Sequence, residues 1–307
     1  MTPYFSIIIS VYNKAAYVAD TLTSVLDQSY SNFEVIVVND GSTDESLEIL
    51  ERFDDFRLQI INQDNHGASH ARNHGINLAK GRYIALLDGD DLWDSHFLET
   101  MHTTIDNHPT QSIFTSAIAH KYDDNIVPVP YSFKIDKDVL ILDYFEASQK
   151  HSALSGSSTV FKRDILDITG NFDERIRSGQ DTDLWIRFGI HFPVVFVSKV
   201  LVYYVFNRQS LSNTTSDINL KPKFDKYKEE ENTNFYLKKF LDRNRFSLAI
   251  LSKLNGDCVS FEFFRTSLSL RSLSLKRKIL IMSPKWVISL LLKLKSITGK
   301  KLYYDTL

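Results

Sequence analysis

Short apolar runs alternate with amphipathic stretches along the first part of the chain. The apolar runs have the length of buried strands, and between them apolar residues recur at helical spacing, as at Val18, Leu22 and Val25. The alternation predicts a mostly parallel α/β sheet with helices on both faces. The expected strands span residues 5–10, 33–38, 56–61 and 83–87, and the expected helices span 13–28, 42–52 and 68–79.

Polar residues at the predicted helix starts suggest caps. Asn13 is expected to cap the first helix, and Ser42 with Glu45 has the spacing of a capping box for the second. The middle of the chain is less regular. Its pattern predicts helices at 95–107 and 181–188, strands at 112–120, 159–162, 194–197 and 200–205, and a loop at Pro128 and Pro130.

The pattern changes near Ser216, where a highly charged segment begins and helical periodicity follows to the end. We therefore expect an α/β domain at 1–215 and a smaller C-terminal helical, basic region at 216–307. The composition, 43% hydrophobic and 24% charged, is that of a folded globular protein.

The cellular compartment is indicated by three features. Cys258 is the single cysteine, which excludes an internal disulfide and fits a reducing environment. The apolar run at 5–11 is too short for a signal peptide, and no run reaches the ~20 apolar residues that span a bilayer. We expect a cytoplasmic protein.

The C-terminal region is strongly basic although the whole chain carries a net charge of −2. Between Arg271 and Lys301 the sequence has nine basic residues and no acidic one. Pro284 can open a helix with Lys285 and Lys293 on one stripe and Trp286 and leucines elsewhere. Such a helix can lie peripherally on the inner face of an anionic cell membrane through 271–301, or it can pack on protein. The absence of acids favours the membrane, and the acidic remainder of the chain disfavours nucleic acid.

Ligands of open α/β sheets bind beyond the carboxyl ends of the strands. There the chain places Tyr12 and Asn13 after the first strand and Asp40 after the second. Tyr12 can stack on a planar base, and Asp40 can accept hydrogen bonds from a sugar hydroxyl or a base. We therefore expect a ligand site at this edge.

The fourth strand ends in the run DGDD, which contains Asp88, Asp90 and Asp91. Carboxylates at a strand tip repel one another unless they are paired or bind a metal. Asp88 and Asp90 offer the oxygen ligands that Mg²⁺ or Mn²⁺ prefers, with substrate phosphates completing the shell. A simple turn before an acidic helix start is the alternative, and Asp91 in particular could be only a helix-leading acid.

The chain lacks the glycine-rich signatures that usually hold nucleotide phosphates. After the first strand it has SVYNK at 10–14, where a dinucleotide-binding protein would need G-x-G-x-x-G, and no P-loop sequence occurs. A metal held by Asp88 and Asp90 is the remaining way to carry a diphosphate.

Four segments read SIIISVYNKAAYV, FEVIVVNDGSTDES, GASHARNHGINLAKGRYIALLDGDD and GQDTDLWIR. In this order and spacing they resemble family 2 glycosyltransferases with the GT-A fold, over about residues 4–212. The resemblance implies transfer of a sugar from a nucleotide diphosphate donor, usually a UDP-sugar, with inversion at the anomeric carbon and help from Mn²⁺ or Mg²⁺.

The same resemblance implies roles for matching positions. Tyr12 would stack on the uracil and Asp40 would bond its N3–H. Asp90 would ligate the metal, Asp88 would contact the ribose or the metal, and Asp181 would match the catalytic base. The remaining matches would place Ser10, Asn13 and Arg72 near the donor nucleotide and Gly156, Ser157 and Asp183 on the acceptor side.

An inverting transfer needs a base on the face of the sugar opposite the leaving group. Asp181 starts a predicted helix, so its residue type alone favours a helix-leading acid. The resemblance favours the base, with Asp183 as the fallback. The chain departs from the family in having Gln180 where Glu is common and Asn207 where histidine is often found, and Arg208 could serve the diphosphate instead.

We therefore predict a metal-dependent, inverting hexosyl- or N-acetylhexosaminyltransferase. It would move a sugar from a UDP-sugar to a glycan or lipid-linked saccharide, as in polysaccharide, lipopolysaccharide or capsule biosynthesis. Gln180 and Asn207 leave open a nucleotide-sugar-binding or scaffold protein without catalysis. A nucleotidyltransferase is a third class, disfavoured because no glycine-rich, basic loop follows the first strand.

Overall fold

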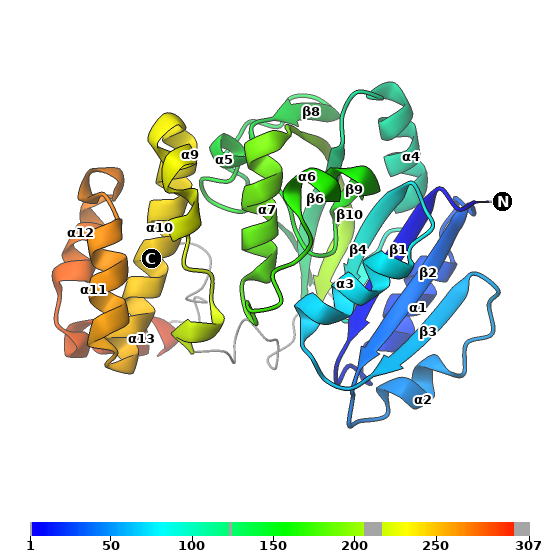
Figure 1. The fold of residues 1–307 in the computed structure, drawn as a ribbon, viewed down its shortest axis with the longest axis horizontal. Helices are drawn as coiled ribbons and strands as arrows, with labels where there is room; N and C mark the ends of the chain where they lie inside the picture. The colour runs from blue at the N-terminus through cyan, green and yellow to red at the C-terminus, as the bar shows by residue number, and fades with distance from the viewer. Residues whose placement is uncertain (1, 123–124, 206–216, 298–307) are drawn as a thin grey trace.

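The computed structural model describes residues 2–122, 125–205 and 217–297 and shows a sheet flanked by helices, with a helical region at one end (Figure 1). The strands are β1 (Phe5–Val11), β2 (Phe33–Asp40), β3 (Leu58–Gln63), β4 (Tyr83–Asp88), β5 (Asp91–Trp93), β6 (Ile113–Tyr122), β7 (Asn125–Pro128), β8 (Val139–Leu142), β9 (Val160–Lys162) and β10 (Val194–Val205). Their order is β3-β2-β1-β4-β9-β6-β10-β5, with β7 beside β6 and β8 beside β10.

The predicted mostly parallel sheet is confirmed. The four strands β3, β2, β1 and β4 are parallel to one another, and β6 is parallel to β10. β9 runs antiparallel to both of its neighbours, β4 and β6. The carboxyl ends of β1, β2 and β4 therefore meet at one edge, where the ligand site was expected.

Helices cover both faces of the sheet. They are α1 (Val18–Leu26), α2 (Ser46–Leu50), α3 (Ala68–Leu78), α4 (Phe97–Asn107), α5 (Tyr144–Ala147), α6 (Leu166–Thr169) and α7 (Gln180–His191). Neighbouring residues of a strand point to opposite faces. Ile8 and Leu86 belong to a buried cluster with α3 and α7, whereas Ile9 and Leu87 belong to a second cluster with α1 and α4.

Both predicted helix caps are wrong. α1 begins at Val18 and α2 at Ser46, and neither has a side-chain cap. The polar side chains instead join two loops: Ser42 Oγ accepts a hydrogen bond from the Asn13 backbone N–H, and Asn13 Oδ1 accepts one from the Thr43 N–H. The loops β1–α1 and β2–α2 are thereby tied together, a contact between segments distant in sequence that local cap rules do not include.

The middle of the chain differs from the prediction at three places. Pro128 ends a short strand, β7, at the side of β6, where a proline is tolerated because its missing N–H is not needed. The two strands expected at 194–197 and 200–205 form one strand, β10, with register shifts between Val197 and Val202. β5 and β8 were missed because their three and four residues are too short to show a period.

The C-terminal region is helical, as predicted. Its helices are α9 (Lys228–Thr233), α10 (Phe235–Asn255), α11 (Cys258–Ser267), α12 (Leu275–Met282) and α13 (Lys285–Ile297). α10 starts after Asn234, whose side chain accepts the Leu237 N–H, and ends at Gly256, whose φ of +79° closes the helix. In the described part of the chain, no helix is long and apolar enough to cross a membrane.

The helical region shares a core with the sheet domain. Phe240 and Phe246 of α10 belong to the same buried cluster as Trp185 of α7 and Ile8 of β1. The predicted boundary near Ser216 falls outside the described residues and stays a prediction. The shared core shows that the region after it packs on the sheet domain and is not separated from it by solvent.

Candidate active site

The residues expected on the ligand side lie at one edge of the sheet. Ser10 of β1 pairs with Asp88 of β4, and Val11 pairs with Asn39, the residue before Asp40 in β2. Tyr12 follows β1 directly and is 48% exposed, so its ring is available to a ligand. The geometry brings the predicted donor-side positions of three separate strands together.

The loop after β1 is held in an unusual backbone conformation. Asn13 has a φ of +53°, a left-handed geometry that asparagine tolerates better than most residues. The following Lys14 donates its backbone N–H to Ser46 Oγ at 2.7 Å, and Ala15 donates to Asp44 Oδ2 at 3.0 Å. The Lys14 side chain forms an ion pair with Asp90, in the turn between β4 and β5.

Asp40 organises the loop between β3 and α3. Its Oδ1 accepts hydrogen bonds from Gln63 Nε2 at 2.7 Å and the His66 N–H at 2.9 Å, and its Oδ2 accepts the Gly67 N–H at 2.7 Å. Gly67 can present this N–H because its φ of +90° suits glycine. A carboxylate has about four lone-pair positions, so a fourth donor from a base fits. The carboxylate itself is buried.

The three acids of the DGDD tip have three different environments. The Asp88 side chain is 31% exposed and pairs with Arg72 at 2.5 Å, and the Asp90 side chain is 13% exposed and pairs with Lys14. Asp91 is buried and accepts hydrogen bonds from Ser157 Oγ at 2.5 Å and from the Val205 N–H at 3.2 Å. Asp91 lies in β5, so the interpretation as a helix-leading acid is wrong.

Asp91 differs from its neighbours in its electrostatics as well. Burial raises its pKa well above the usual aspartate range, and the nearby Asp90 and Asp88 carboxylates raise it further. Because its carboxyl resists ionisation, Asp91 stabilises the strand tip through its hydrogen bonds and not through its charge. Ser157, which donates to Asp91 and accepts the Asp88 N–H, is fully buried, and this argues against the predicted acceptor contact through its side chain.

Arg72 joins the strand tip to the predicted base. Its Nη1 lies 2.9 Å from Asp181 Oδ1 and its Nη2 lies 2.5 Å from Asp88 Oδ1, while its guanidinium lies over the Phe172 ring. The side chain is almost fully buried. Burial opposes its charge, but the carboxylates of Asp181 and Asp88 outweigh this and raise its pKa. One buried cation therefore fixes two carboxylates from segments far apart in sequence.

Asp181 is a partly buried carboxylate whose surroundings shift its pKa. Burial raises its pKa, the Arg72 guanidinium lowers it, and the Asp88 carboxylate raises it, with a net increase above the usual aspartate value. The raised pKa makes the ionised group more basic than an ordinary aspartate. Its side chain is 30% exposed, so the group can still meet a substrate hydroxyl.

Gly156 lies between the two carboxylates that Arg72 joins. A Cβ at this position would come within 3.1 Å of Asp88 Oδ2 and 3.2 Å of Asp181 Oδ2. The missing side chain keeps this small space open. Gly156 therefore lies where the strand tip and Asp181 approach each other, and its place on the acceptor side stays a prediction.

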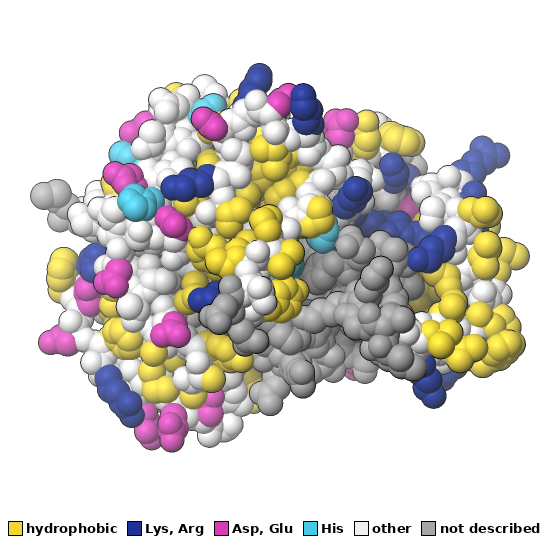
Figure 2. Space-filling model, turned by 180° about the vertical axis from the view of Figure 1, so that it is seen from behind, with side chains coloured by type: hydrophobic (Ala, Val, Ile, Leu, Met, Phe, Trp, Pro, Cys, Tyr) yellow, Lys and Arg dark blue, Asp and Glu magenta, His cyan; other side chains and the backbone are white. Residues whose placement is uncertain are grey.

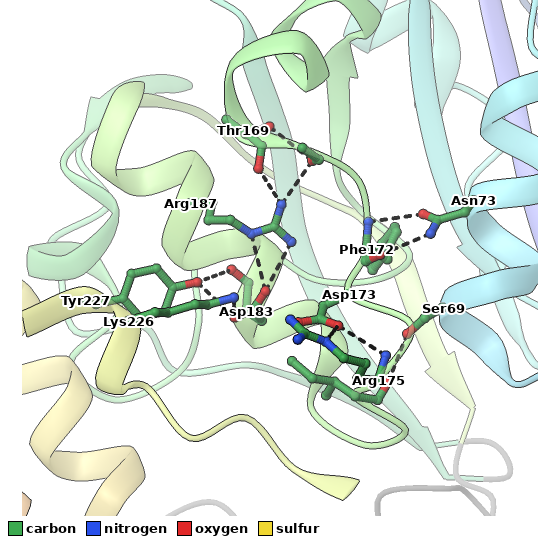
Figure 3. Close-up of polar contacts among 12 residues, drawn as sticks. Ser69, Asn73, Thr169, Phe172, Asp173, Arg175, Asp183, Arg187, Lys226 and Tyr227 are labelled. Atoms are coloured by element: carbon green, nitrogen blue, oxygen red, sulfur yellow. Dashed lines mark hydrogen bonds and ion pairs between the residues drawn. The ribbon is translucent and has the colours of Figure 1, made fainter.

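Asp183 lies in a separate buried network on α7 (Figure 3). It is 1% exposed, and its carboxylate contacts Lys226 Nζ at 2.7 Å, Tyr227 Oη at 2.8 Å and Arg187 Nη2 at 3.1 Å. Its partners Lys226 and Tyr227 come from the C-terminal region. This structural role argues against Asp183 as an acceptor contact or a fallback base.

The loop that leads into α7 is attached to α3. Asn73 Nδ2 donates to the Phe172 carbonyl and Asn73 Oδ1 accepts the Phe172 N–H, both at 3.0 Å, and Ser69 Oγ donates to the Ile176 carbonyl (Figure 3). These side chains flank Arg72 on the same helix. They hold the two segments that carry Arg72 and Asp181 at a fixed spacing.

The strand tip fits a divalent cation that takes further ligands from a substrate. Asp88 and Asp90 supply two carboxylates within three residues, the hard oxygen donors that Mg²⁺ and Mn²⁺ accept. Among the described residues, no group of three His, Cys, Asp or Glu side chains could hold a metal alone. A diphosphate and water would complete the shell, and Lys14 is a cation already beside Asp90.

Comparison with known proteins decides the family. Residues 6–169 match the profile described as Glycosyl transferase family 2. The chain belongs to glycosyl transferase family 2. Among its relatives, the glycosyltransferase GlyG of Streptococcus pneumoniae is 38% identical over 108 residues, which are 34% of this chain and 36% of GlyG. The putative teichuronic acid biosynthesis glycosyltransferase TuaG of Bacillus subtilis is 43% identical over 100 residues, 32% of this chain and 40% of TuaG.

These family 2 relatives are matched over well under two thirds of their own length. A solved structure matches nearly the whole chain. The crystal structure of S. aureus TarS in complex with UDP-GlcNAc has a TM-score of 0.71 and 20% sequence identity, and the match covers 98% of this chain and 93% of that one. The likeness shows that this family 2 chain and TarS share a fold, including the C-terminal helical region.

Sequence reasoning missed two side chains of this site. Lys14 stands in the first family motif, and its position just after a strand on the ligand side was the available signal. Tyr204 of β10 begins the stretch that was compared with the family for its missing histidine, but it was given no role; burial raises the pKa of its hydroxyl well above the usual value, and Asp91 and Asp88 raise it further. Asn207, the departure from the family's histidine, and Arg208, considered for the diphosphate, both lie outside the described residues.

Proposed function

We propose that the protein transfers a sugar from a UDP-sugar donor to a hydroxyl group of a glycan or lipid-linked saccharide, with inversion. The observation that carries this proposal is the position of Gly156 between the carboxylates of Asp88 and Asp181. The arrangement sets a strand tip suited to a metal-bound diphosphate beside a carboxylate with a raised pKa. These are the two groups that an inverting transfer needs on opposite sides of the sugar.

In this proposal Tyr12 and Asp40 bind the base, and Asp88 and Asp90 hold Mn²⁺ or Mg²⁺ with the diphosphate. The metal, when bound, stabilises the charge that develops on the leaving phosphate. Lys14, beside Asp90, adds a second positive charge on the same side. Asp181 takes the proton of the acceptor hydroxyl as that oxygen attacks the anomeric carbon.

Arg72 sets the protonation and position of Asp181 without touching the reacting atoms. Its charge keeps Asp181 ionisable despite burial, and its second bond, to Asp88, fixes the distance between base and donor site. A general base placed in this way contributes typically 10²–10⁴-fold to the rate.

The relatives support a substrate class. TuaG is named for teichuronic acid biosynthesis, and the TarS crystal contains UDP-GlcNAc. We propose a hexosyl or N-acetylhexosaminyl donor and an acceptor among surface polysaccharides or their lipid-linked precursors.

A donor screen tests the proposed function. UDP release is measured from a panel of UDP-sugars with and without Mn²⁺, and Asp90→Ala serves as the matched variant. We expect metal-dependent UDP release that Asp90→Ala abolishes. Full activity of Asp90→Ala would remove the metal assignment, binding without UDP release would indicate a non-catalytic protein, and release of pyrophosphate would indicate a nucleotidyltransferase.

A further inference from the structure

The last two helices present an apolar surface that the sheet domain does not cover. On α12, Leu275, Ile279 and Met282 are 74%, 58% and 79% exposed. They stand at spacings of four and three residues, so they form one stripe along the helix. The opposite side of α12 is buried through Leu280 and Ile281.

α13 carries a second stripe of the same kind. Trp286, Leu290 and Leu294 are 69%, 50% and 52% exposed and recur every four residues, with Leu291 beside them at 47%. Ile288, on the other side, is buried in the core. α13 thus packs on the protein along one edge, as one reading of the sequence expected, and leaves a wide apolar face open.

The two stripes are neighbours at the turn between the helices. Met282 ends α12 and Trp286 lies in the first turn of α13, separated by only three residues, and both are among the most exposed apolar side chains here. Lys253 Nζ holds this turn by donating to the Ile281 and Ser283 carbonyls. Figure 2 shows hydrophobic side chains gathered at this end of the molecule, with lysine and arginine side chains around them.

The positive charge around the stripes favours an anionic partner. From residue 271 to residue 301 the sequence has nine basic residues and no acidic one, and Lys276, Lys285 and Lys293 are exposed beside the apolar stripes. A protein partner would need an apolar face rimmed only by acids. A bilayer with anionic headgroups offers an apolar interior and a negative surface together, and basic helices with tryptophan and leucine insert at that boundary.

We propose that α12 and α13 dock the protein on an anionic lipid surface, with the stripes of Leu275–Met282 and Trp286–Leu294 entering the headgroup region. The lysines beside them contact the lipid phosphates. This surface is independent of the donor site, and its test does not depend on the proposed function.

Flotation of the full-length protein with lipid vesicles is the direct test. Vesicles of phosphatidylcholine alone are compared with vesicles that contain phosphatidylglycerol. We expect binding to the anionic vesicles only, weakened at least tenfold by high salt because the lysine contacts are screened. Equal binding to both vesicle types, or none to either, overturns the proposal.

Two sets of variants separate the apolar and the charged contributions. Trp286→Ser with Leu290→Ser removes part of the apolar stripe, and Lys276→Glu with Lys285→Glu and Lys293→Glu reverses the charge. All of these positions are exposed, so the fold should persist. Each set should weaken binding to anionic vesicles at least tenfold. Binding that persists in both sets places the lipid contact elsewhere and overturns the proposal.

Matched controls come from exposed residues of the sheet domain. Phe56, between α2 and β3, is 97% exposed and Lys80, between α3 and β4, is exposed; these elements lie across the molecule from α12 and α13 (Figure 1). Phe56→Ser and Lys80→Glu should bind anionic vesicles as the unaltered protein does. If they lose binding to the same extent as the helix variants, the effect is one of general charge or hydrophobicity, and the proposal fails.

Tryptophan fluorescence supplies a second readout. Trp93 and Trp185 are 4% and 2% exposed, so a change on vesicle addition reports on Trp286. We expect a blue shift with anionic vesicles, lost in Trp286→Phe while flotation is retained.

Sedimentation velocity tests whether a second copy of the chain, and not lipid, binds this surface. A dimer that Trp286→Ser with Leu290→Ser dissociates, without any vesicle binding, assigns the surface to a second copy of the chain and overturns the lipid proposal.

Discussion

Asp181 and Asp183 stand two residues apart in α7, and replacing each by asparagine should have opposite consequences. Asp181 faces Arg72 and the space beside Gly156, whereas Asp183 is buried among Lys226, Tyr227 and Arg187. Asp181→Asn should remove the proton acceptor and lower kcat by about 10²–10⁴-fold. Asp183→Asn should instead act on stability.

The expected stability of Asp181→Asn follows from the direction of its pKa shift. The folded-state pKa lies above the unfolded value because burial and Asp88 raise it more than Arg72 lowers it. The ionised carboxylate therefore costs folding free energy above the folded-state pKa and costs none below the unfolded value. Asparagine removes this cost but also one of the two carboxylates that offset the charge of the buried Arg72, so the melting temperature should fall by less than it does for Asp183→Asn.

The expected loss for Asp183→Asn follows from its contacts. The carboxylate is 1% exposed and contacts two cations and a hydroxyl group, and the amide keeps only part of these bonds. Leaving a buried charge unpaired costs about 3 kcal/mol, which lowers the melting temperature by about 6 °C in a chain of this size. The remaining folded fraction should keep its kcat.

The assay pairs thermal unfolding with UDP release at saturating donor, and UDP binding by calorimetry confirms that the donor site is intact. Normal transfer by Asp181→Asn would show that the base lies elsewhere. A fall in melting temperature for Asp181→Asn as large as that for Asp183→Asn would refute the reasoning from burial and charge, because lost folding would then explain lost activity.

Three further predictions concern the same site. Gly156→Ala puts a methyl group within 3.2 Å of the Asp88 and Asp181 carboxylates. The value of kcat should therefore fall at least about tenfold while UDP affinity is kept. An unchanged kcat would show that the reaction does not use the space beside Gly156. Lys14→Met removes the ammonium group that pairs with Asp90. The affinity for Mn²⁺ without nucleotide, measured by electron paramagnetic resonance, should rise about fivefold. An equal affinity would place the metal elsewhere. Burial raises the pKa of Asp181, and the base must be ionised to accept a proton. The value of log kcat should therefore rise with pH, with its midpoint above the ordinary aspartate pKa of about 4. A midpoint at or below that value would contradict the raised pKa.

The apolar periodicity was enough to predict the central strands and their flanking helices. Phe5–Val11 and Tyr83–Asp88 are found within a residue or two of their predicted bounds, because buried strands and amphipathic helices are local patterns. The helix caps failed for the opposite reason. Asn13 and Ser42 satisfy each other's loops, and no local rule contains that contact.

The site shows the same division between local and long-range information. Residue type and the rule for strand ends placed Tyr12, Asp40, Asp88 and Asp90 at one edge, and the family motifs added Asp181. The three acids of the tip could not be told apart from sequence. Their roles depend on Lys14, Arg72 and Ser157, which reach them from other segments.

The sequence by itself determined the alternation of strands and helices, the acid-rich strand tip, the basic C-terminal region and membership in family 2, because each is written in neighbouring residues or in ordered motifs. Only the tertiary structure decided which carboxylates are paired, which are buried and which face a substrate. Burial and charge pairing set pKa values, and both arise when distant segments pack together. Arg72 is the clearest case, since its two partners lie on β4 and α7.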